Sequence, residues 1–480
     1  MKVARVAIIG GGISGLATAF AIQEKAKKLS KNVELAIFEK ENRLGGTIKS
    51  ERIQGYLCES GPTGFLDNKP DTPKLVGDLG LKNKLLPSND AARKRYLYID
   101  GRLQQVPESP PAFLSSKILS LRGKLRIVGE VRSKKPPLGA DESIFEFASR
   151  HIGKEAAEKL IDAVTTGIFA GDARKLSVKS CFPVMIELEK EGSGSLVRAM
   201  FGRVRAKRKQ KKEAGETGAS EVSTGSEMGG GNLTSFDEGM ETLVAGLKEA
   251  IKGNFYLSKA CKGFEKGDGK YAFSAEGAEK PFEADIVVLA IPSYAAAELL
   301  ESFDEEMAKA LKEIPYAPIN VVNFGYPRQS VTHSLEGFGF LIPSREKREI
   351  LGTIWTTSVF GGTAPQNHVA LKTMIGGAQN PEAAALDDRA TIELVRKELR
   401  KIMGISADPT FIKIYRYEKG IPQYVIGHGE RLGVLEKRLT GHPGLFLTGN
   451  AYLGIGVNDC TRNASLVSDK IMEYLKTSQA

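Results

Sequence analysis

Residues 3–15 read VARVAIIGGGISG, a run rich in β-branched residues that leads directly into a glycine-rich turn. The run predicts a buried strand. The next residues, SGLATAFAIQEKAKKL at 14–29, place apolar side chains on one side of a helix, and NVELAIFEK at 32–40 predicts a second strand. Strand, turn, helix and strand together predict a βαβ unit at the start of the chain.

The glycines of this turn have the GxGxxG spacing of a dinucleotide site. In that motif Gly10 permits the tight turn, Gly12 lets a pyrophosphate approach, and Gly15 lets the helix pack closely on the strand. Ile13 and Ser14 begin the helix, whose N-terminus then faces the phosphates. The spacing alone is a weak signal in a chain with 52 glycines. The strand before it and the helix after it favour a dinucleotide site.

The residues after the second strand narrow the choice of cofactor. Glu39 ends that strand, where a carboxylate binds the ribose of a dinucleotide and would repel a 2′-phosphate. From Lys40 to Thr47 the chain reads KENRLGGT, with Arg43 and the pair Gly45-Gly46. This extended pattern resembles the signature that follows the nucleotide fold in the amine oxidase and phytoene desaturase group of FAD enzymes. The glycines would let the backbone approach the cofactor, and the planar donors of Arg43 suit a phosphate.

Composition sets broad limits on the protein. The 480 residues are enough for about three domains, and 41% are apolar, as in ordinary globular proteins. A formal charge of +10 favours an acidic substrate, an anionic membrane or nucleic acid. The four cysteines have no metal-binding or CxxC spacing, which indicates a reducing compartment and no metal site. We expect neither a signal peptide nor a spanning helix, because no stretch near 18 residues is free of charge.

Later segments extend this plan. The apolar runs ADIVVLAIP at 284–292 and GLFLTGN at 444–450 resemble further strands of the same sheet, which would make the nucleotide domain discontinuous. Residues 91 to about 200 are rich in helix formers and basic residues, and 294–440 mix strand and helix patterns. The polar, small residues of 213–232 predict a flexible loop.

The C-terminal run predicts a strand, a turn and a final helix. The turn holds Gly449 and Asn450, and the helix begins near Gly456, Val457 and Asn458. A helix N-terminus at this point would stabilise the negative charge that develops on a flavin during reduction. An ordinary glycine-rich loop before a terminal helix is an equal alternative for this segment alone.

The source of electrons follows from what the sequence lacks. We find no second dinucleotide turn for NADPH and no CxxC pair of a disulfide reductase. An organic substrate is therefore the expected donor. No Ser/His/Asp, Cys/His or metal cluster emerges, and His428 is better explained as a hydrogen-bonded structural residue than as a catalyst.

Several segments, in order along nearly the whole chain, resemble the oxygen-dependent bacterial members of the protoporphyrinogen oxidase family. They include ESGPTGFLDNKPDTPKLVGDLGL at 59–81, TGIFAGDARKLSVKSCFP at 166–183, GFGFLIPS at 337–344 and TGNAYLGIGVNDC at 448–460. The resemblance implies one non-covalent FAD per chain, which oxidises protoporphyrinogen IX to protoporphyrin IX by successive hydride transfers to flavin N5. Oxygen is the implied electron acceptor and hydrogen peroxide the by-product, in the penultimate step of haem synthesis.

The sequence patterns predict an α/β fold, with a discontinuous Rossmann-like nucleotide-binding domain, an α-helical insert and an α+β insert. The family resemblance implies three parts: a discontinuous Rossmann-like FAD-binding domain, an α+β substrate domain and an α-helical membrane-associating domain. The expected boundaries are 1–84, 237–292 and 441–480 for the FAD-binding domain, 85–90, 196–236 and 293–440 for the substrate domain, and 91–195 for the helical domain. We expect a cytoplasmic protein associated peripherally with the cytoplasmic face of the membrane. The sequence leaves the oligomeric state open, a homodimer included.

The resemblance also assigns residues to the site. Its further cofactor contacts fall on Gly61, Pro62, Thr63, Cys261 and Ala290. Cys261 departs from the family, whose members often carry valine against the adenine. For the porphyrinogen, the resemblance assigns Arg95 to a propionate. It assigns a loop beside the ring to Gly167, Phe169, Ala170 and Gly171. The apolar contacts around the macrocycle fall on Phe338, Gly339, Leu341, Ile354 and Met374. Without the resemblance, the apolar residues would be assigned to a core and Arg95 to the surface. No general acid or base is assigned, because positioning and the flavin supply most of the catalysis.

Two questions stay open at this stage. Residues 196–212, LVRAMFGRVRAKRKQKK, suit a basic amphipathic helix on anionic lipid, although a solvated helix face is slightly favoured. Nucleic acid is not an expected partner, because no known binding module is present. The alternative substrate is coproporphyrinogen III, whose four propionates call for more cations than Arg95 alone. A flavoprotein scaffold without activity is the remote alternative.

Overall fold

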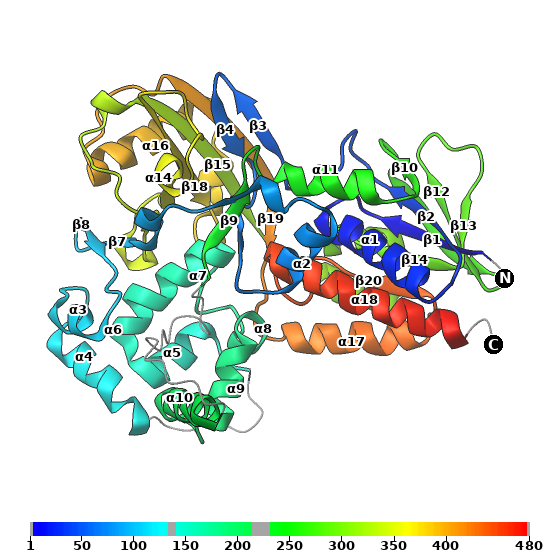
Figure 1. Ribbon diagram of the computed structural model, residues 1–480, viewed down its shortest axis with the longest axis horizontal. Helices are drawn as coiled ribbons and strands as arrows, with labels where there is room; N and C mark the ends of the chain where they lie inside the picture. The colour runs from blue at the N-terminus through cyan, green and yellow to red at the C-terminus, as the bar shows by residue number, and fades with distance from the viewer. Residues whose placement is uncertain (1–2, 133–140, 214–230, 478–480) are drawn as a thin grey trace.

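The structure is a computed structural model that describes residues 3–132, 141–213 and 231–477. Figure 1 shows a sheet with flanking helices on the right, a second sheet at the upper left and a group of helices at the lower left. Most of the predicted loop at 213–232 lies outside the described residues.

The first sheet carries the glycine-rich turn. It is parallel, with strand order β10-β2-β1-β14-β20. The strands are β1 (Ala4–Ile9), β2 (Val33–Phe38), β10 (Asn254–Tyr256), β14 (Ile286–Leu289) and β20 (Leu445–Leu447). The predicted strands within 284–292 and 444–450 are therefore confirmed as members of the N-terminal sheet.

Both faces of this sheet are buried. Val6 and Ile8 face four helices, and Ala7 and Ile9 face a small antiparallel sheet and three further helices. On the first face lie α1 (Ile13–Lys28), α2 (Asp71–Asp78), α11 (Glu241–Ala250) and α18 (Val457–Thr477); on the second lie β11 (Cys261–Gly267), β12 (Lys270–Ala275), β13 (Phe282–Ala284), α12 (Ser293–Leu300), α13 (Glu305–Lys312) and α17 (His428–Thr440). Burial on both sides explains why these strands are almost continuously apolar.

The second sheet has seven strands in the order β19-β15-β18-β17-β16-β7-β8, antiparallel except between β16 and β7. The strands are β19 (Phe411–Pro422), β15 (Tyr316–Pro327), β18 (His368–Gly376), β17 (Ile350–Trp355), β16 (Gly339–Leu341), β7 (Tyr96–Ile99) and β8 (Arg102–Gln105). One face packs on α16 (Asp388–Met403) through Val395, Leu399 and Met403.

The other face of the second sheet is partly covered by a hairpin of β3 (Ser50–Ile53) and β4 (Tyr56–Glu59), where Tyr56 stacks on Phe411. Around the two sheets lie short elements: β5 (Phe65–Leu66), β6 (Leu85–Pro87), β9 (Leu233–Phe236), α14 (Thr356–Val359) and α15 (Pro381–Ala384). The mixed strand and helix pattern of 294–440 is confirmed.

The structure corrects the expected start of the helical domain. Residues 96–105 were assigned to it from sequence, but they form β7 and β8 and extend the second sheet. The reason is local. Tyr96 to Ile99 is aromatic and apolar, and Asp100-Gly101, both with positive φ, makes the two-residue turn of a hairpin.

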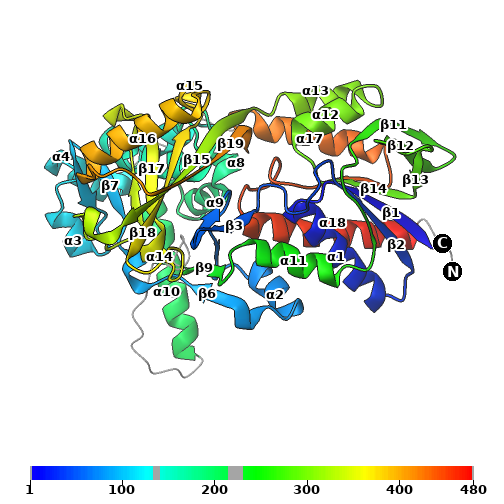
Figure 2. The same ribbon diagram turned by 90° about the horizontal axis from the view of Figure 1, so that it is seen from above.

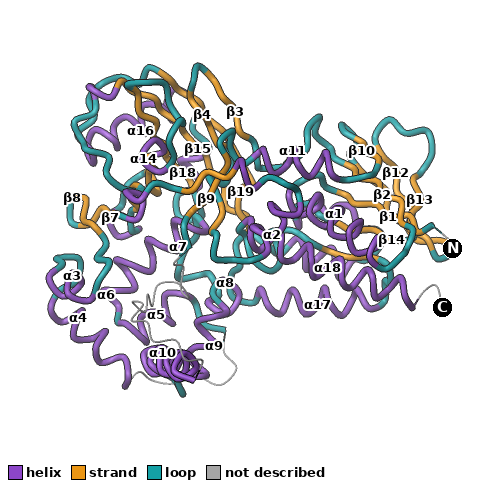
Figure 3. Tube along the Cα trace, in the orientation of Figure 1, coloured by secondary structure: helices purple, strands orange, loops and turns teal. Residues whose placement is uncertain are grey.

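Helices make up most of the third body, which is mainly purple at the lower left of Figure 3. They are α3 (Pro110–Ser115), α4 (Leu121–Val128), α5 (Ile144–Ile152), α6 (Lys154–Ala156), the π-helical turn 157–161, α7 (Asp162–Phe169), α8 (Val178–Cys181), α9 (Pro183–Glu191) and α10 (Leu196–Glu213). Among the described residues, none of the helices combines the length and the apolar character that a membrane crossing requires.

Helix α10 also differs from expectation, because residues from 196 were assigned to the substrate domain. It packs instead on α9, and Figure 2 shows it projecting from the body of the molecule. The buried carboxylate of Glu130 accepts hydrogen bonds from Ser195 Oγ (2.7 Å) and from the backbone N–H groups of Leu196 (2.8 Å) and Val197 (3.2 Å). A carboxylate at a helix N-terminus stabilises the helix, so this contact joins α10 to the helical body.

Candidate functional site

The glycine-rich turn is closed on one side and open on the other. Gly10 has φ +112°, and a Cβ on Gly15 would lie 2.0 Å from the Gly10 carbonyl oxygen and 3.2 Å from the Ala290 Cβ. A Cβ on Gly12 would meet only the Gly46 Cα, at 4.0 Å. Gly10 and Gly15 are therefore needed by the protein itself, whereas the space beside Gly12 is free for a ligand.

Glu39 closes the turn from the second strand. Its buried carboxylate accepts hydrogen bonds from the N–H groups of Gly11 (2.8 Å) and Glu41 (2.9 Å). The backbone N–H of Lys259 donates to the Glu39 carbonyl at 2.8 Å, which brings the start of β11 alongside. There, burial and the charge of Glu39 raise the pKa of Cys261 to about 12, so this thiol is neutral and unreactive.

Arg43 holds the loop that follows the second strand. Its guanidinium donates to the carbonyls of Leu44 (2.7 Å), Gly46 (2.5 Å) and Ile48 (3.1 Å). It thereby shapes the loop that holds Gly45 and Gly46, with several of its donors already used. Lys40 is exposed, with its ammonium 3.7 Å from Glu41.

The start of α18 offers unsatisfied polar atoms at the other end of the predicted cofactor site. Asn458 donates to the Leu66 carbonyl at 3.0 Å, while its Oδ1 is buried without a partner among the described residues. Thr448 Oγ1, just before Gly449, is also buried without a hydrogen-bond partner among the described residues. Buried polar atoms normally have partners, so these atoms fit a bound polar group. The open turn and these atoms together fit a dinucleotide cofactor.

Predicted substrate contacts share one face of the second sheet. Gly339, Ile354 and Lys372 are neighbours across β16, β17 and β18, and Met374 follows Lys372 on the same face. Phe338, Leu341, Ile354 and Met374 are all half-buried. Gly339 has φ +135°, and a Cβ there would lie 2.0 Å from the Thr353 carbonyl oxygen. The predicted substrate contacts form an apolar and partly open area of this face.

The end of α7 meets this face. A Cβ on Gly167 would lie 2.6 Å from Leu341, and Ala170, in the left-handed conformation at φ +46°, accepts a hydrogen bond from the N–H of Ala378 (2.7 Å). Gly171 accepts one from Gln379 Nε2 at 3.2 Å. The backbone of the predicted loop thus lies against the sheet. Phe169 does not share this placement, because its side chain is buried in the helical core with Phe182 and Tyr424.

Arg95 lies at the edge of the same face. Its guanidinium carbon is 5.8 Å from the centroid of the Phe338 ring, so these two predicted residues are brought together. Its neighbours Arg93 and Lys94 pair with Asp90 (3.4 Å) and Glu336 (3.0 Å). Arg95 itself is exposed, and among the described residues it has no carboxylate partner.

Sequence reasoning missed three buried polar side chains beside this face: Glu59, Asn323 and Lys372. Lys372 Nζ donates to the Gly61 carbonyl at 2.6 Å and to Thr63 Oγ1 at 3.1 Å. A lysine inside the apolar run VALKTMIGG at 369–377 was the available signal, because lysine is almost never buried without a reason.

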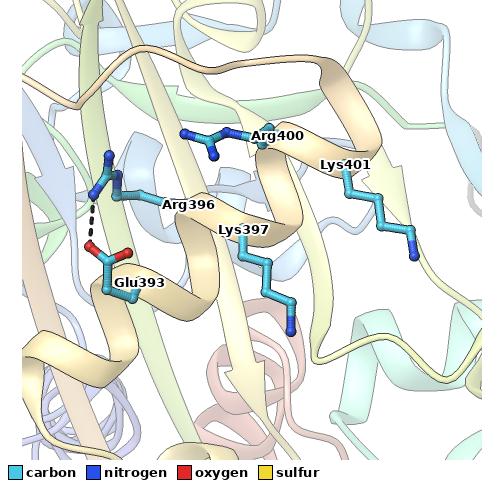
Figure 4. A pocket seen from close by; sticks show the side chains of 5 residues that line it. All are labelled: Glu393, Arg396, Lys397, Arg400 and Lys401. Atoms are coloured by element: carbon cyan, nitrogen blue, oxygen red, sulfur yellow. Dashed lines mark hydrogen bonds and ion pairs between the residues drawn. The ribbon is translucent and has the colours of Figure 1, made fainter.

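A surface hollow of about 220 Å³ lies on α16, lined by Glu393, Arg396, Lys397, Arg400 and Lys401 (Figure 4). Arg396 pairs there with Glu393 at 2.7 Å. Because α16 packs on the opposite face of the second sheet, this basic hollow is separate from the candidate site. His428 also lies apart as a structural residue: its Nε2 is 3.1 Å from the Tyr452 carbonyl oxygen, and its ring stacks on Tyr424.

Comparison with known proteins supports a family assignment. The model of the flavin containing amine oxidoreductase family matches residues 13–472. The chain is 30% identical to a protein named coproporphyrinogen III oxidase from Bacillus subtilis, over 98% of each chain. It is 31% identical to protoporphyrinogen oxidase 1 of Arabidopsis thaliana chloroplasts, over 98% of this chain and 88% of the relative. Human protoporphyrinogen oxidase is also 31% identical, over 95% of each chain.

A solved structure from Exiguobacterium sp. 255-15, assigned as a protoporphyrinogen oxidase, has the same fold. Its TM-score is 0.81 at 25% identity, covering 99% of this chain and 100% of that one. A reduced UDP-galactopyranose mutase matches with a TM-score of 0.69 at 15% identity, covering 98% of this chain and 94% of that one, a similarity of fold alone.

Proposed function

Since the chain belongs to the flavin-containing amine oxidoreductase family and is a flavin-dependent oxidoreductase, we propose that it oxidises a porphyrinogen to a porphyrin, with protoporphyrinogen IX as its substrate. The observation that carries this proposal is the full-length similarity, near 30% identity, to relatives named for porphyrinogen oxidation. FAD as the flavin and oxygen as the electron acceptor belong to the same proposal.

The geometry supports a large apolar substrate with an anionic edge. A porphyrinogen has an apolar macrocycle and propionates at its rim, and apolar pockets with a few placed cations bind such molecules. The half-buried face of Phe338, Leu341, Ile354 and Met374 suits the macrocycle. Arg95, at the edge of that face, suits a propionate.

Bound FAD would supply the hydride acceptor. The protein residues in this scheme orient the macrocycle, through the sheet face on one side and the Gly167–Gly171 backbone on the other. We assign no general acid or base to these contacts, and the pyrrole proton passes to solvent.

Coproporphyrinogen III is the alternative substrate, and the name of the Bacillus subtilis relative favours it. Its four propionates require more cations. Lys94, next to Arg95, is already paired with Glu336 at 3.0 Å, which favours the substrate with fewer propionates.

The direct test is porphyrin fluorescence in air after mixing the FAD-loaded protein with protoporphyrinogen IX or, separately, with coproporphyrinogen III. Boiled protein measures autoxidation. A clear preference for protoporphyrinogen IX is the expected result, and a preference for coproporphyrinogen III would replace it with the alternative. Activity on neither, together with no bleaching of the flavin by porphyrinogen without air, would leave a flavoprotein scaffold.

We further propose that the helical body docks on the cytoplasmic face of a membrane. Leu121, Leu125 and Val128 follow one another along α4 at spacings of four and three residues, and all three are exposed. They form one apolar stripe, since such spacings share a helix face. Phe201 of α10 is exposed as well. An exposed apolar stripe on a basic protein suits an anionic lipid surface.

A further inference from the structure

Lys372 is an unusual residue for the middle of a sheet. It lies in β18 with 3% of its surface exposed, between Ile354 of β17 and Asn323 of β15. Burying an ammonium is costly unless it is paired, so a lysine at such a position needs an explanation.

The contacts of Lys372 cross from the second sheet to the N-terminal part of the chain. Both of its hydrogen-bond acceptors, the Gly61 carbonyl and Thr63 Oγ1, are neutral and belong to the segment expected to contact the flavin. Glu59 is a carboxylate whose charge acts on Lys372 and favours the ammonium. That carboxylate is held instead by the Met240 N–H and by Ser50 Oγ, each at 2.8 Å. The positive charge is therefore only partly compensated.

A second buried donor lies next to Lys372. Asn323, 7% exposed, occupies the neighbouring position on β15, and its Nδ2 is buried with no hydrogen-bond partner among the described residues. A ligand that satisfies two donors must offer acceptors. The ring of a porphyrinogen presents pyrrole N–H donors, whereas a flavin ring carries carbonyl oxygens and unprotonated nitrogens. The donor set therefore fits the flavin better than the substrate.

We propose that Lys372 is a positioning residue of the flavin site, which fixes the Gly61–Thr63 segment from the second sheet and holds a positive charge beside the bound flavin. The family assignment, and not the identity of the substrate, is what the inference rests on. A nearby cation favours the reduced, anionic flavin over the oxidised one, as opposite charges attract most strongly in a poorly hydrated site. Lys372 would then act on the flavin without touching the porphyrinogen.

The test compares Lys372→Met, which keeps length and removes charge, with Lys413→Met. Lys413 lies on the same face, two strands away on β19, and pairs with Glu51 at 3.6 Å instead of contacting the segment. We would measure FAD affinity by reconstitution of apoprotein, and the flavin midpoint potential by anaerobic dye equilibration. We expect Lys372→Met to weaken FAD at least tenfold and to shift the potential downward, with Lys413→Met unchanged.

Equal effects of the two variants, or no shift of the potential in Lys372→Met, would overturn the inference. If Lys372→Met does not fold, Lys372→Gln takes its place; it keeps a donor without the charge and should still lower the potential, and an unchanged potential would count against the inference in the same way. Neither readout uses a porphyrinogen. Failure of the proposed substrate would therefore leave this test intact, and failure of this test would leave the substrate proposal standing.

Discussion

The glycines of the first turn serve two purposes, and substitution separates them. We predict that Gly12→Val folds but loses FAD, because the space beside Gly12 is free of protein atoms within contact distance and would be filled by the cofactor. Gly15→Ala is the contrasting variant. Its Cβ would meet the Gly10 carbonyl oxygen at 2.0 Å, so it should lower the melting temperature of the apoprotein itself.

Circular dichroism of the apoproteins and FAD content after reconstitution separate these cases. If Gly12→Val still bound a full complement of FAD, the pyrophosphate of FAD would not lie beside this turn.

Arg95 is the residue for which we predict an effect on substrate alone. Arg95→Ala should weaken porphyrinogen binding about tenfold or more, because a charge-assisted hydrogen bond contributes roughly 1.5–3 kcal/mol. FAD content should stay normal. Arg93→Ala is the matched control, since Arg93 is already paired with Asp90 at 3.4 Å. Equal apparent affinities of the two variants in steady-state kinetics would remove Arg95 from the site.

Glu59 makes the free energy of unfolding depend on pH. Burial raises its pKa to about 7 from an ordinary 4.5. Between these values the unfolded chain has lost the proton that the folded chain keeps, so stability falls as pH rises from about 4.5 to 7. Because each pKa unit corresponds to about 1.4 kcal/mol, the loss approaches roughly 3 kcal/mol. Burial lowers the pKa of Lys372 to about 8, so Lys372 changes the free energy of unfolding only at pH values above the range from 4.5 to 7.

Urea unfolding at pH 5, 6 and 7 measures this dependence. Wild type should lose stability relative to Glu59→Gln across the range, because glutamine does not titrate. Parallel curves for the two proteins would mean that Glu59 is ionised in the folded state throughout.

At the residue scale, sequence could predict the positions that a motif names. Gly10, Gly12 and Gly15 lie in the turn, and Glu39 follows the second strand beside it, as expected. The sequence could not predict the role of Lys372, because strand alternation places a residue on one face of a sheet without showing which segment covers that face. The segment after β4 covers Lys372, and it lies more than 300 residues away from Lys372 in the chain.

At the scale of elements, the stripe on α4 yields a prediction about membranes. The double variant Leu121→Ser and Leu125→Ser should bind vesicles of anionic lipid several-fold less than wild type, because it removes exposed apolar side chains that would enter the lipid interface. Flavin content should not change. Cosedimentation with vesicles measures the binding, and exposed Leu466 of α18, changed to serine, is the control. If Leu466→Ser lost as much vesicle binding as the double variant, the membrane contact would not lie on the stripe of α4.

Elements with strong local signals were predicted well. The first βαβ unit, the strands at 284–292 and 444–450 and the helix after Gly456 all appear in the structure. The hairpin at 96–105 was missed although Asp100-Gly101 is a typical hairpin turn, because the basic, helix-forming residues around it dominated the prediction. The attachment of α10 depends on Glu130, a long-range contact that no local pattern reveals.

At the scale of the whole molecule, the candidate site is made by all three bodies. The nucleotide sheet supplies the turn, the second sheet supplies the apolar face, and the end of α7 supplies the backbone opposite that face. Sequence patterns predicted the nucleotide sheet and its two inserts, and the family resemblance implied the three parts and assigned their residues. How the parts meet depends on packing between distant segments, for which one sequence carries no direct signal.

The order of strands in the nucleotide sheet also governs when the protein can be completed. Val6 pairs with Ile286, and Val287 pairs with Leu445, so the sheet joins segments that are far apart in the sequence and are synthesised at widely separated times. Such distant pairings close slowly, because the chain entropy of large loops must be overcome first. A nascent chain that lacks β20 would hold an incomplete sheet with an open edge, prone to aggregation. The complete cofactor site therefore forms only after β20 and α18 have been synthesised.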